Sequence, residues 1–276
     1  MSDSSSTPIL GTIRASAWGG FFDCPMRFYY TNILGLRIPS SGAAALGTAI
    51  HHGTAHFDAA RLNGDEVTVD EAVDQSIDAV KNPAEEVLWD DDLFQTDAQK
   101  LAAILTAKYC IEVGSERRYA AVELACDALD IGTEHGVIRV TGTTDRIRIL
   151  PDGRKGISDF KSGKTATRKN ADGTRSANTA AHHLQLGIYT MMAEQASGEV
   201  LDAPAEIIGL QTTKEAPVAT GEVEDVRTAL LGNDEHPGVI TLAAKMLKNG
   251  TFPPNPKSMM CSGKYCAGHS RCIYKA

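Results

Sequence analysis

The chain has 276 residues, of which 42% are hydrophobic and 22% charged, and its formal net charge is −8. This length and apolar fraction suffice for one large domain or two small ones with a hydrophobic core. The acidic balance argues against a uniformly basic surface that coats nucleic acid, and no apolar run approaches the roughly 20 residues that cross a bilayer. The polar, serine-rich N-terminus lacks the layout of a secretory signal, so we expect a cytoplasmic protein without a membrane partner.

The first third of the chain is expected to be helical. Residues 16–36 are rich in aromatic side chains, with Pro25 suited to the first turn of a helix and Gly35 to its end. A stretch of small residues, 40–47, leads into a second helix that carries His51. Acidic helices are expected over 65–119, with candidate N-caps at Thr68 or Asp70 and at Thr96 or Asp97.

The period of the pattern changes after residue 120. Alternation at Val122, Leu124 and Cys126 indicates a half-buried strand. The later elements are expected as strands over 137–140, 144–150 and 157–161, a mobile loop over 165–178, a helix over 180–196, a last strand over 207–211 and a helix over 237–248. This order predicts an α/β fold with a central mixed sheet flanked by helices, plus a helical insertion at 60–119.

Charge is distributed unevenly along the chain. Residues 65–97 carry twelve Asp or Glu and one base, whereas 154–175 carry seven bases against two acids, and 245–276 carry six bases and no acid. A chain that is acidic overall but keeps two basic stretches can still hold a phosphate backbone locally. Solvated surface faces would give the same pattern.

Two aspartates on neighbouring predicted strands are the first candidates for chemistry. Because adjacent strands lie about 5 Å apart, Asp145 and Asp159 can hold one divalent cation, and hard oxygen ligands suit Mg²⁺ or Mn²⁺. Strand alternation puts Lys161 on the same face as Asp159, where its ammonium could orient or deprotonate the attacking water and stabilise charge on phosphorus. Taken alone, the pattern is common, and simple surface ion pairs with Arg146 and Lys161 would explain it.

Five short motifs, in order, point to a known family. They are CPMRFYY at 24–30, GTAIH at 47–51, GTTDRI at 142–147, ISDFKSG at 157–163 and QLGIY at 185–189. Together they resemble PD-(D/E)XK nucleases of the RecB-like branch. The first motif is similar to the opening helix of the iron–sulfur members, which include CRISPR-associated adaptation nucleases, the AddB nuclease domain and many phage exonucleases. The resemblance implies a single nuclease domain over 1–276 with a restriction-endonuclease-like core.

The resemblance also implies roles for individual residues. The implied metal ligands are His51, Asp145, Asp159 and the carbonyl of Phe160. The implied catalytic residues are Asp145, Asp159, Lys161, Gln185 and Tyr189. Gln185 and Tyr189 lie one helical turn apart, so they share a face that can point toward the site or the DNA. Glu123 could add a carboxylate, but its place in a strand favours a solvent-facing residue.

The cysteines suggest a second metal centre. Three of them fall within the last sixteen residues, which is typical of a ligand set. The expected ligands are Cys24, Cys261, Cys266 and Cys272 in the tail 251–276 and the opening helix. Such thiolates imply a soft metal centre: the resemblance implies a [4Fe–4S] cluster, Zn²⁺ is the rival, and free cysteines are the remaining alternative. Cys110 and Cys126 are interpreted as small buried hydrophobes.

The sequence therefore predicts a metal-dependent deoxyribonuclease, in particular an exonuclease that acts on DNA ends or single strands. The residues expected to hold the DNA backbone are Lys164, Arg168, Lys169 and Arg175, together with the basic tail. The acidic insertion cannot bind DNA favourably, so it is a candidate surface for a protein partner. The alternative is a non-catalytic or partner-activated DNA-end-binding module, for example in CRISPR adaptation or recombination.

Overall fold

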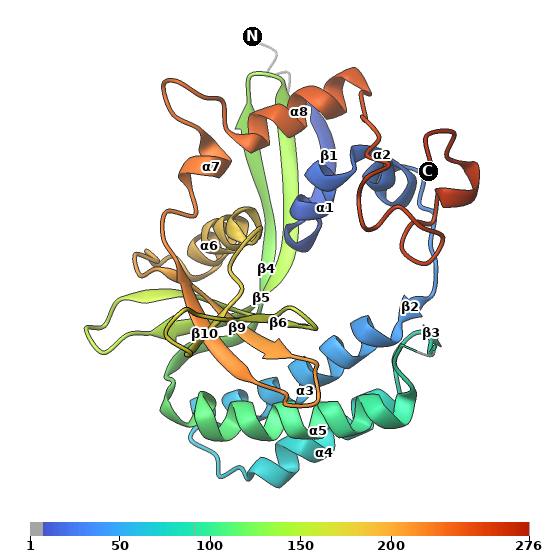
Figure 1. The fold of residues 1–276 in the computed structure, drawn as a ribbon. Helices are drawn as coiled ribbons and strands as arrows, with labels where there is room; N and C mark the ends of the chain where they lie inside the picture. Colours follow the sequence, from blue (N-terminus) through green and yellow to red (C-terminus); the bar gives the residue numbers. More distant parts are fainter. Residues whose placement is uncertain (1–7, 91, 276) are drawn as a thin grey trace.

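The computed structural model describes residues 8–90 and 92–275 and has a six-stranded mixed sheet at its centre (Figure 1). Residues 1–7, which form most of the serine-rich N-terminus that was predicted to lack a secretory signal, lie outside the described residues. The strands of the sheet are β1 (Ile9–Arg14), β4 (Tyr119–Thr133), β5 (Gly136–Ile149), β6 (Lys155–Gly163), β9 (Ala205–Gln211) and β10 (Val218–Val223). They are ordered β1-β5-β6-β9-β10, and β4 also pairs with β5. β1 is parallel to β5 and β6 is parallel to β9, whereas the other pairs are antiparallel.

Helices cover both sides of the sheet, so the predicted α/β fold is confirmed (Figure 1). One side carries α3 (Gly42–Asn63), α4 (Val69–Lys81) and α5 (Gln95–Glu112), and the other carries α1 (Trp18–Asp23), α6 (His183–Ser197) and α8 (Val239–Asn249). The shorter elements are α2 (Pro25–Phe28), α7 (Thr228–Leu231), the pair β2 (Ser40–Ser41) and β3 (Val87–Leu88), and the hairpin β7 (Thr167–Lys169) and β8 (Arg175–Ala177). Within the described residues, every helix is too short or too polar to cross a membrane.

Two hydrophobic clusters hold the helices to the two faces of the sheet. In β9, Ile207 belongs to the cluster that α1, α6 and α8 complete, and Ile208 belongs to the one formed with α3, α4 and α5. Successive side chains of a strand point to opposite faces, so a strand that is covered on both faces is apolar at consecutive positions. Cys110 is buried in the second cluster, as predicted, and Cys126 is half-buried against the first.

β5 pairs with three other strands of the sheet. β4 runs along one of its edges. Along the other edge, β5 pairs with β1 as far as Thr141 and with β6 from Arg146 onward. Residues 142–145, called the strand junction below, therefore lie where the pairing of β5 changes from one strand to another. β4 still pairs with Gly142, Thr143 and Thr144 along the other edge, so the strand junction is open only along the edge that β1 and β6 share.

Local sequence signals explain several of the helix ends. Pro25 occupies the first turn of α2, and Gly35 has a φ of 68° just after the helical segment Tyr29–Ile33, as predicted. Thr68 caps α4: its Oγ1 accepts a hydrogen bond from the Glu71 N–H at 3.2 Å, and the Glu71 carboxylate accepts one from the Thr68 N–H at 2.7 Å.

The predicted cap of the next helix is wrong. α5 begins at Gln95, with Phe94 in the N-cap position, so Thr96 and Asp97 lie within its first turn instead of before it. A carboxylate in the first turn is still favourable, because it faces the positive end of the helix dipole. Asp97 therefore indicated the correct end of the helix, but its position is three residues after the N-cap, Phe94.

The strands also differ from the prediction in number and length. β5 is one strand where two were predicted. Gly142 lies within β5, where an added Cβ would make a tight contact, 3.1 Å from Cε1 of Tyr189. β1 was not predicted, and β10 follows the segment predicted to be the last strand. The predicted mobile loop 165–178 contains the β7–β8 hairpin, which is closed by a hydrogen bond from the Asn170 N–H to the Thr174 carbonyl at 2.8 Å.

Candidate active site

Two buried aspartates lie beside the strand junction. Asp145 on β5 is 8% exposed and Asp159 on β6 is 2% exposed. The backbone N–H of Phe160 donates a 2.8 Å hydrogen bond to Oδ2 of Asp145, which links the two strands beyond their regular pairing at Arg146 and Ser158. The structure therefore brings together the two carboxylates that the sequence placed on neighbouring strands.

Side chains from β6 and α6 surround Asp159. Nζ of Lys161 lies 2.6 Å from Oδ2 of Asp159, as expected for residues two positions apart on one strand face. From α6, Nε2 of Gln185 donates to Oδ1 of Asp159 at 3.3 Å and to the Tyr189 hydroxyl at 3.2 Å. Gln185 and Tyr189 thus share a helix face that points at the carboxylates.

His51 approaches Asp145 from α3, on the other side of the sheet. Its Nδ1 lies 3.6 Å from Oδ1 of Asp145, and its ring packs edge-on against Phe160 with the centroids 5.5 Å apart. The next residue, His52, is exposed. Of the two adjacent histidines, the first faces the carboxylates, in agreement with the motif.

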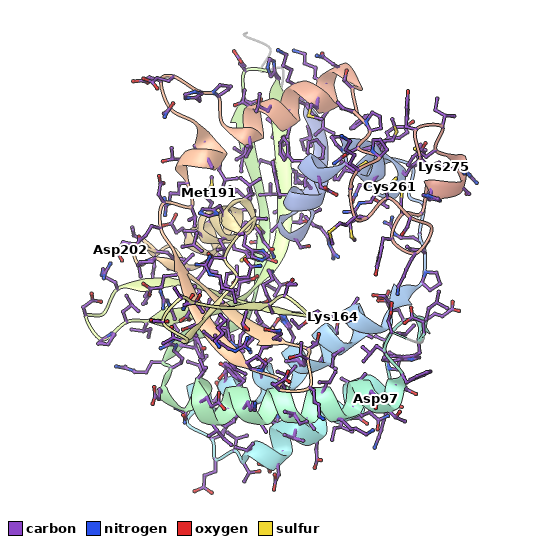
Figure 2. All side chains as sticks on the ribbon, viewed as in Figure 1. Asp97, Lys164, Met191, Asp202, Cys261 and Lys275 are labelled. Atoms are coloured by element: carbon purple, nitrogen blue, oxygen red, sulfur yellow. The ribbon has the colours of Figure 1, made fainter. Side chains whose placement is uncertain are left out.

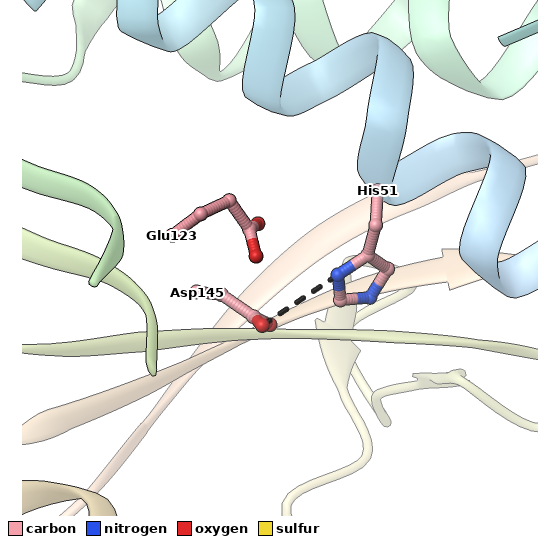
Figure 3. Close-up of side chains that lie close together, drawn as sticks. All are labelled: His51, Glu123 and Asp145. Atoms are coloured by element: carbon pink, nitrogen blue, oxygen red, sulfur yellow. Dashed lines mark ion pairs between the residues drawn. The ribbon is translucent and has the colours of Figure 1, made fainter. Parts of the chain in front are cut away.

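Glu123 also reaches this site, although the sequence favoured a solvent-facing residue. The residue is exposed, but its carboxylate and the ligand atoms of His51 and Asp145 all lie within 4.8 Å of one another (Figure 3). Alternation along β4 fails at this position: Ala121 and Leu124, three residues apart, both pack against the same core cluster. The signal that would locate Glu123 is therefore a backbone irregularity, which the residue pattern does not contain.

Burial sets the protonation of these groups. It raises the pKa of Asp159 to about 6, an effect that Lys161 opposes and Asp145 strengthens. Burial also raises the pKa of Asp145, against the hydrogen bond from Phe160 and the charge of Lys161. For His51, burial lowers the pKa, so the imidazole is neutral at pH 7 and one ring nitrogen can bind a cation.

The donor set fits a divalent cation. It combines a neutral imidazole with carboxylate oxygens, the ligands that Mg²⁺ and Mn²⁺ accept. Oδ2 of Asp159 is buried and accepts no well-aligned hydrogen bond within the described residues, although Lys161 is close. Buried carboxylates held near each other are unfavourable in a protein interior, and a cation between them removes that cost.

The four basic residues predicted to bind DNA are exposed on the β6–β7 connection and its hairpin. They are Lys164, Arg168, Lys169 and Arg175. Lys164 lines a cavity of about 480 Å³ together with Ser162 of β6 and Lys264 of the tail. The positions of Lys164 and of the tail residue Cys261 can be followed in Figure 2. Arg175 donates hydrogen bonds to Thr167 and Gln211, so this side chain is anchored to the hairpin and to β9.

The four predicted cluster cysteines also come together, at a separate place. A single cavity is lined by Cys24, Tyr30, Cys261, Cys266, His269 and Cys272. All four cysteines are half-buried free thiols. The backbone N–H of Asn255 donates to Sγ of Cys24 at 3.4 Å, and the Asn255 side chain donates to the Asp23 carbonyl at 2.9 Å. The tail is therefore attached to the segment between α1 and α2, as a shared ligand set requires.

Comparison with known proteins agrees with this geometry. A family model described as the PD-(D/E)XK nuclease superfamily matches residues 15–273, and the chain belongs to this superfamily. Membership suggests hydrolytic activity on nucleic acid. Comparison with curated protein sequences gives no significant match.

The solved structures that are similar to the chain include the following two. One is a candidate exonuclease from Eubacterium rectale, with a TM-score of 0.55 at 17% identity, covering 97% of this chain and 91% of that one. The other is the protein SSO0001, with a TM-score of 0.43 at 13% identity, covering 100% of this chain and 89% of that one. The first likeness supports the fold, and the second is below the level at which a shared fold is argued.

Proposed function

We propose that this protein is a metal-dependent deoxyribonuclease of the RecB-like branch, and in particular an exonuclease that acts on DNA ends or single strands. The observation that carries the proposal is the grouping of two buried aspartates, Asp145 and Asp159, with Lys161 and His51 at the strand junction. A structural ion pair accounts for Lys161 and Asp159. It does not account for a second buried carboxylate with a neutral imidazole beside it.

Each residue has a definite task in this proposal. The cation, Mg²⁺ or Mn²⁺, would be held by His51, Asp145, Asp159 and the carbonyl of Phe160, and when bound it would supply Lewis acidity toward the phosphodiester. The ammonium of Lys161, on the same strand face as Asp159, is placed to orient the attacking water, hold or transfer a proton at Nζ, and offset negative charge on phosphorus. Gln185 fixes Asp159 from α6, together with the Tyr189 hydroxyl.

The substrate proposal depends on charge. The exposed basic side chains on the β7–β8 hairpin, on the β6–β7 connection and on the tail can contact phosphates. Such contacts do not depend on the nucleotide sequence. The helical segment 60–119, which we propose as an insertion within a single nuclease domain, is acidic and suits a basic protein partner better than DNA. It meets the tail where Nζ of Lys264 lies 2.7 Å from Oδ2 of Asp90 and 2.6 Å from Oδ2 of Asp92.

We further propose that the four half-buried cysteines bind a [4Fe–4S] cluster, with Zn²⁺ as the rival. The four thiols line one cavity although they come from two ends of the sequence. Both an iron–sulfur cluster and Zn²⁺ accept four thiolates, and iron and zinc analysis of anaerobically purified protein decides between the two.

The test of the nuclease proposal is cleavage of end-labelled single- and double-stranded DNA with Mg²⁺ or Mn²⁺. We expect cleavage by the wild type, and a loss on the order of 10²–10⁴-fold in Lys161→Ala. The matched control is Lys155→Ala, because Lys155 lies on the same strand but pairs with Glu199, away from the aspartates. The product ladder from the wild type gives the polarity of the enzyme.

The same experiment tests the alternative of a non-catalytic or partner-activated DNA-end-binding module. A folded, metal-loaded wild type that binds both DNA substrates and cleaves neither would overturn the independent nuclease. Intact Asp145, Asp159 and Lys161 argue for the catalytic protein.

A further inference from the structure

The backbone at Glu123 is unusual for a residue in a strand. Its φ is 47°, in the left-handed region that residues with a side chain rarely adopt. Such a conformation is unfavourable by itself and persists only where the surrounding structure holds it. At Glu123 it interrupts the alternation of β4 and turns the carboxylate toward His51 and Asp145 (Figure 3).

A buried arginine holds this carboxylate in place. Nη1 of Arg146 donates to Oε1 of Glu123 at 2.8 Å and to the backbone carbonyl of Asp145 at 2.7 Å. Arg146 is itself fully buried: its Nε donates to Asp58 at 2.7 Å, and its guanidinium lies over the Phe160 ring, 4.8 Å from the centroid. One guanidinium thus links Glu123 to the strand that carries Asp145.

Glu123 is not required to neutralise Arg146, because Asp58 already does so from a position that is 1% exposed. Around the site, the four carboxylates of Asp58, Glu123, Asp145 and Asp159 face the two cationic side chains of Arg146 and Lys161. When all four carboxylates are ionised, two negative charges are left over, which matches one divalent cation. The second oxygen of Glu123 accepts no hydrogen bond from the part of the chain that the structure describes.

We propose that Glu123 is a further ligand of the divalent cation, on the side of the site opposite Asp159, and that Arg146 is the residue that positions it. This inference rests on the proposed metal-dependent activity, because it assumes that the same cation is bound. It adds a third carboxylate to the set that the motifs define, supplied by β4.

The test is Mn²⁺ binding without DNA, measured by calorimetry on the full chain with its tail metal in place. We expect Glu123→Gln to weaken Mn²⁺ binding on the order of 10–100-fold, the range found when even indirect supports of a metal are removed. Asp127→Asn is the matched control, since Asp127 is an exposed carboxylate on the same strand. We expect its affinity to equal that of the wild type.

Thermal unfolding separates a ligand from a purely structural partner of Arg146. If Glu123 is a ligand, Glu123→Gln and the shorter Glu123→Asp lose most of the rise in Tm that Mn²⁺ gives the wild type. A lower metal-free Tm with unchanged Mn²⁺ affinity would overturn the inference and leave Glu123 a structural residue. A wild type that binds no Mn²⁺ would overturn the proposed function as well, so the two failures are distinguishable.

Discussion

The carboxylate site and the cysteine site differ in what holds their side chains. Asp145 and Asp159 are buried on paired strands, and a backbone N–H, an amide and an ammonium fix their oxygens. The four cysteines are half-buried and lie in segments with little regular secondary structure. Cys24 is between α1 and α2, and the other three are in the tail after α8. The first site is built by the sheet, whereas the second brings together two ends of the sequence.

The tail also makes direct hydrogen bonds to the opening segment. The Asp23 side chain accepts a hydrogen bond from the Ser258 hydroxyl at 2.5 Å, and the Met26 N–H donates to the Pro253 carbonyl at 3.3 Å. A few half-exposed hydrogen bonds contribute little net stability. Phe252 of the tail also packs against Tyr29, with the ring centroids 5.0 Å apart, and a metal bound by all four thiolates would add a further connection between the two ends. In the proposed function, a metal at the carboxylate site would serve chemistry, whereas a metal at the cysteine site would serve stability.

The largest expected effect follows from removing one charge at the carboxylate site. Asp145→Asn keeps the volume of the side chain and an oxygen that can accept the Phe160 N–H, but it loses an anionic ligand. We expect DNA cleavage to fall on the order of 10³-fold, with no change in whichever metal the cysteines bind, and with no loss of metal-free Tm, because a buried charge is removed. Cleavage assays, metal analysis and thermal melts measure the three quantities.

Asp152→Asn is the control for that variant, since Asp152 lies in the exposed turn after β5. Loss of the cysteine-bound metal in Asp145→Asn would break the comparison, because it would mean that the two sites depend on each other.

The next effect is on stability and comes from the cysteine site. We expect Cys266→Ser to release the bound metal and to destabilise the protein by about 3 kcal/mol, as when a cross-link that closes a long loop is lost. In a chain of this size that corresponds to a fall in Tm of roughly 6–12 °C. The control, Cys126→Ala, changes another half-buried cysteine that lies on β4 away from the cavity. If both variants melt like the wild type, the cysteine site has no stabilising role.

The parts of the molecule that the sequence predicted well are those governed by local periodicity. Alternation in Asp159-Phe160-Lys161 fixes which side chains share a face, and the spacing of Gln185 and Tyr189 does the same on α6. The strand junction could not be predicted in this way. It depends on the missed strand β1, whose parallel partner β5 is more than 100 residues away in the sequence.

Glu123 shows the same limit at the level of one residue. A strict period of two predicts that Glu123 lies on the solvent side of β4, and the residue is indeed exposed. Its carboxylate reaches the site because of one left-handed residue, which is held by an arginine on a neighbouring strand. Neither the conformation nor the partner has a signal in the residue pattern, because both are consequences of packing.

The smallest expected effect is the pH dependence of metal binding at the carboxylate site. Burial raises the pKa of Asp159 from 3.8 to about 6, so between these values the folded, metal-free chain keeps a proton that the unfolded chain has released. This carboxyl therefore makes folding less favourable as the pH rises through that window. A divalent cation competes with the same proton, so it binds more tightly above about pH 6 than below it. We expect the rise in Tm caused by Mn²⁺ to be larger at about pH 7.5 than at about pH 5, and to lose much of this dependence in Asp159→Asn. An equal rise at both values in the wild type would mean that Asp159 does not exchange its proton for the metal, and that the carboxylate site binds its cation through other ligands.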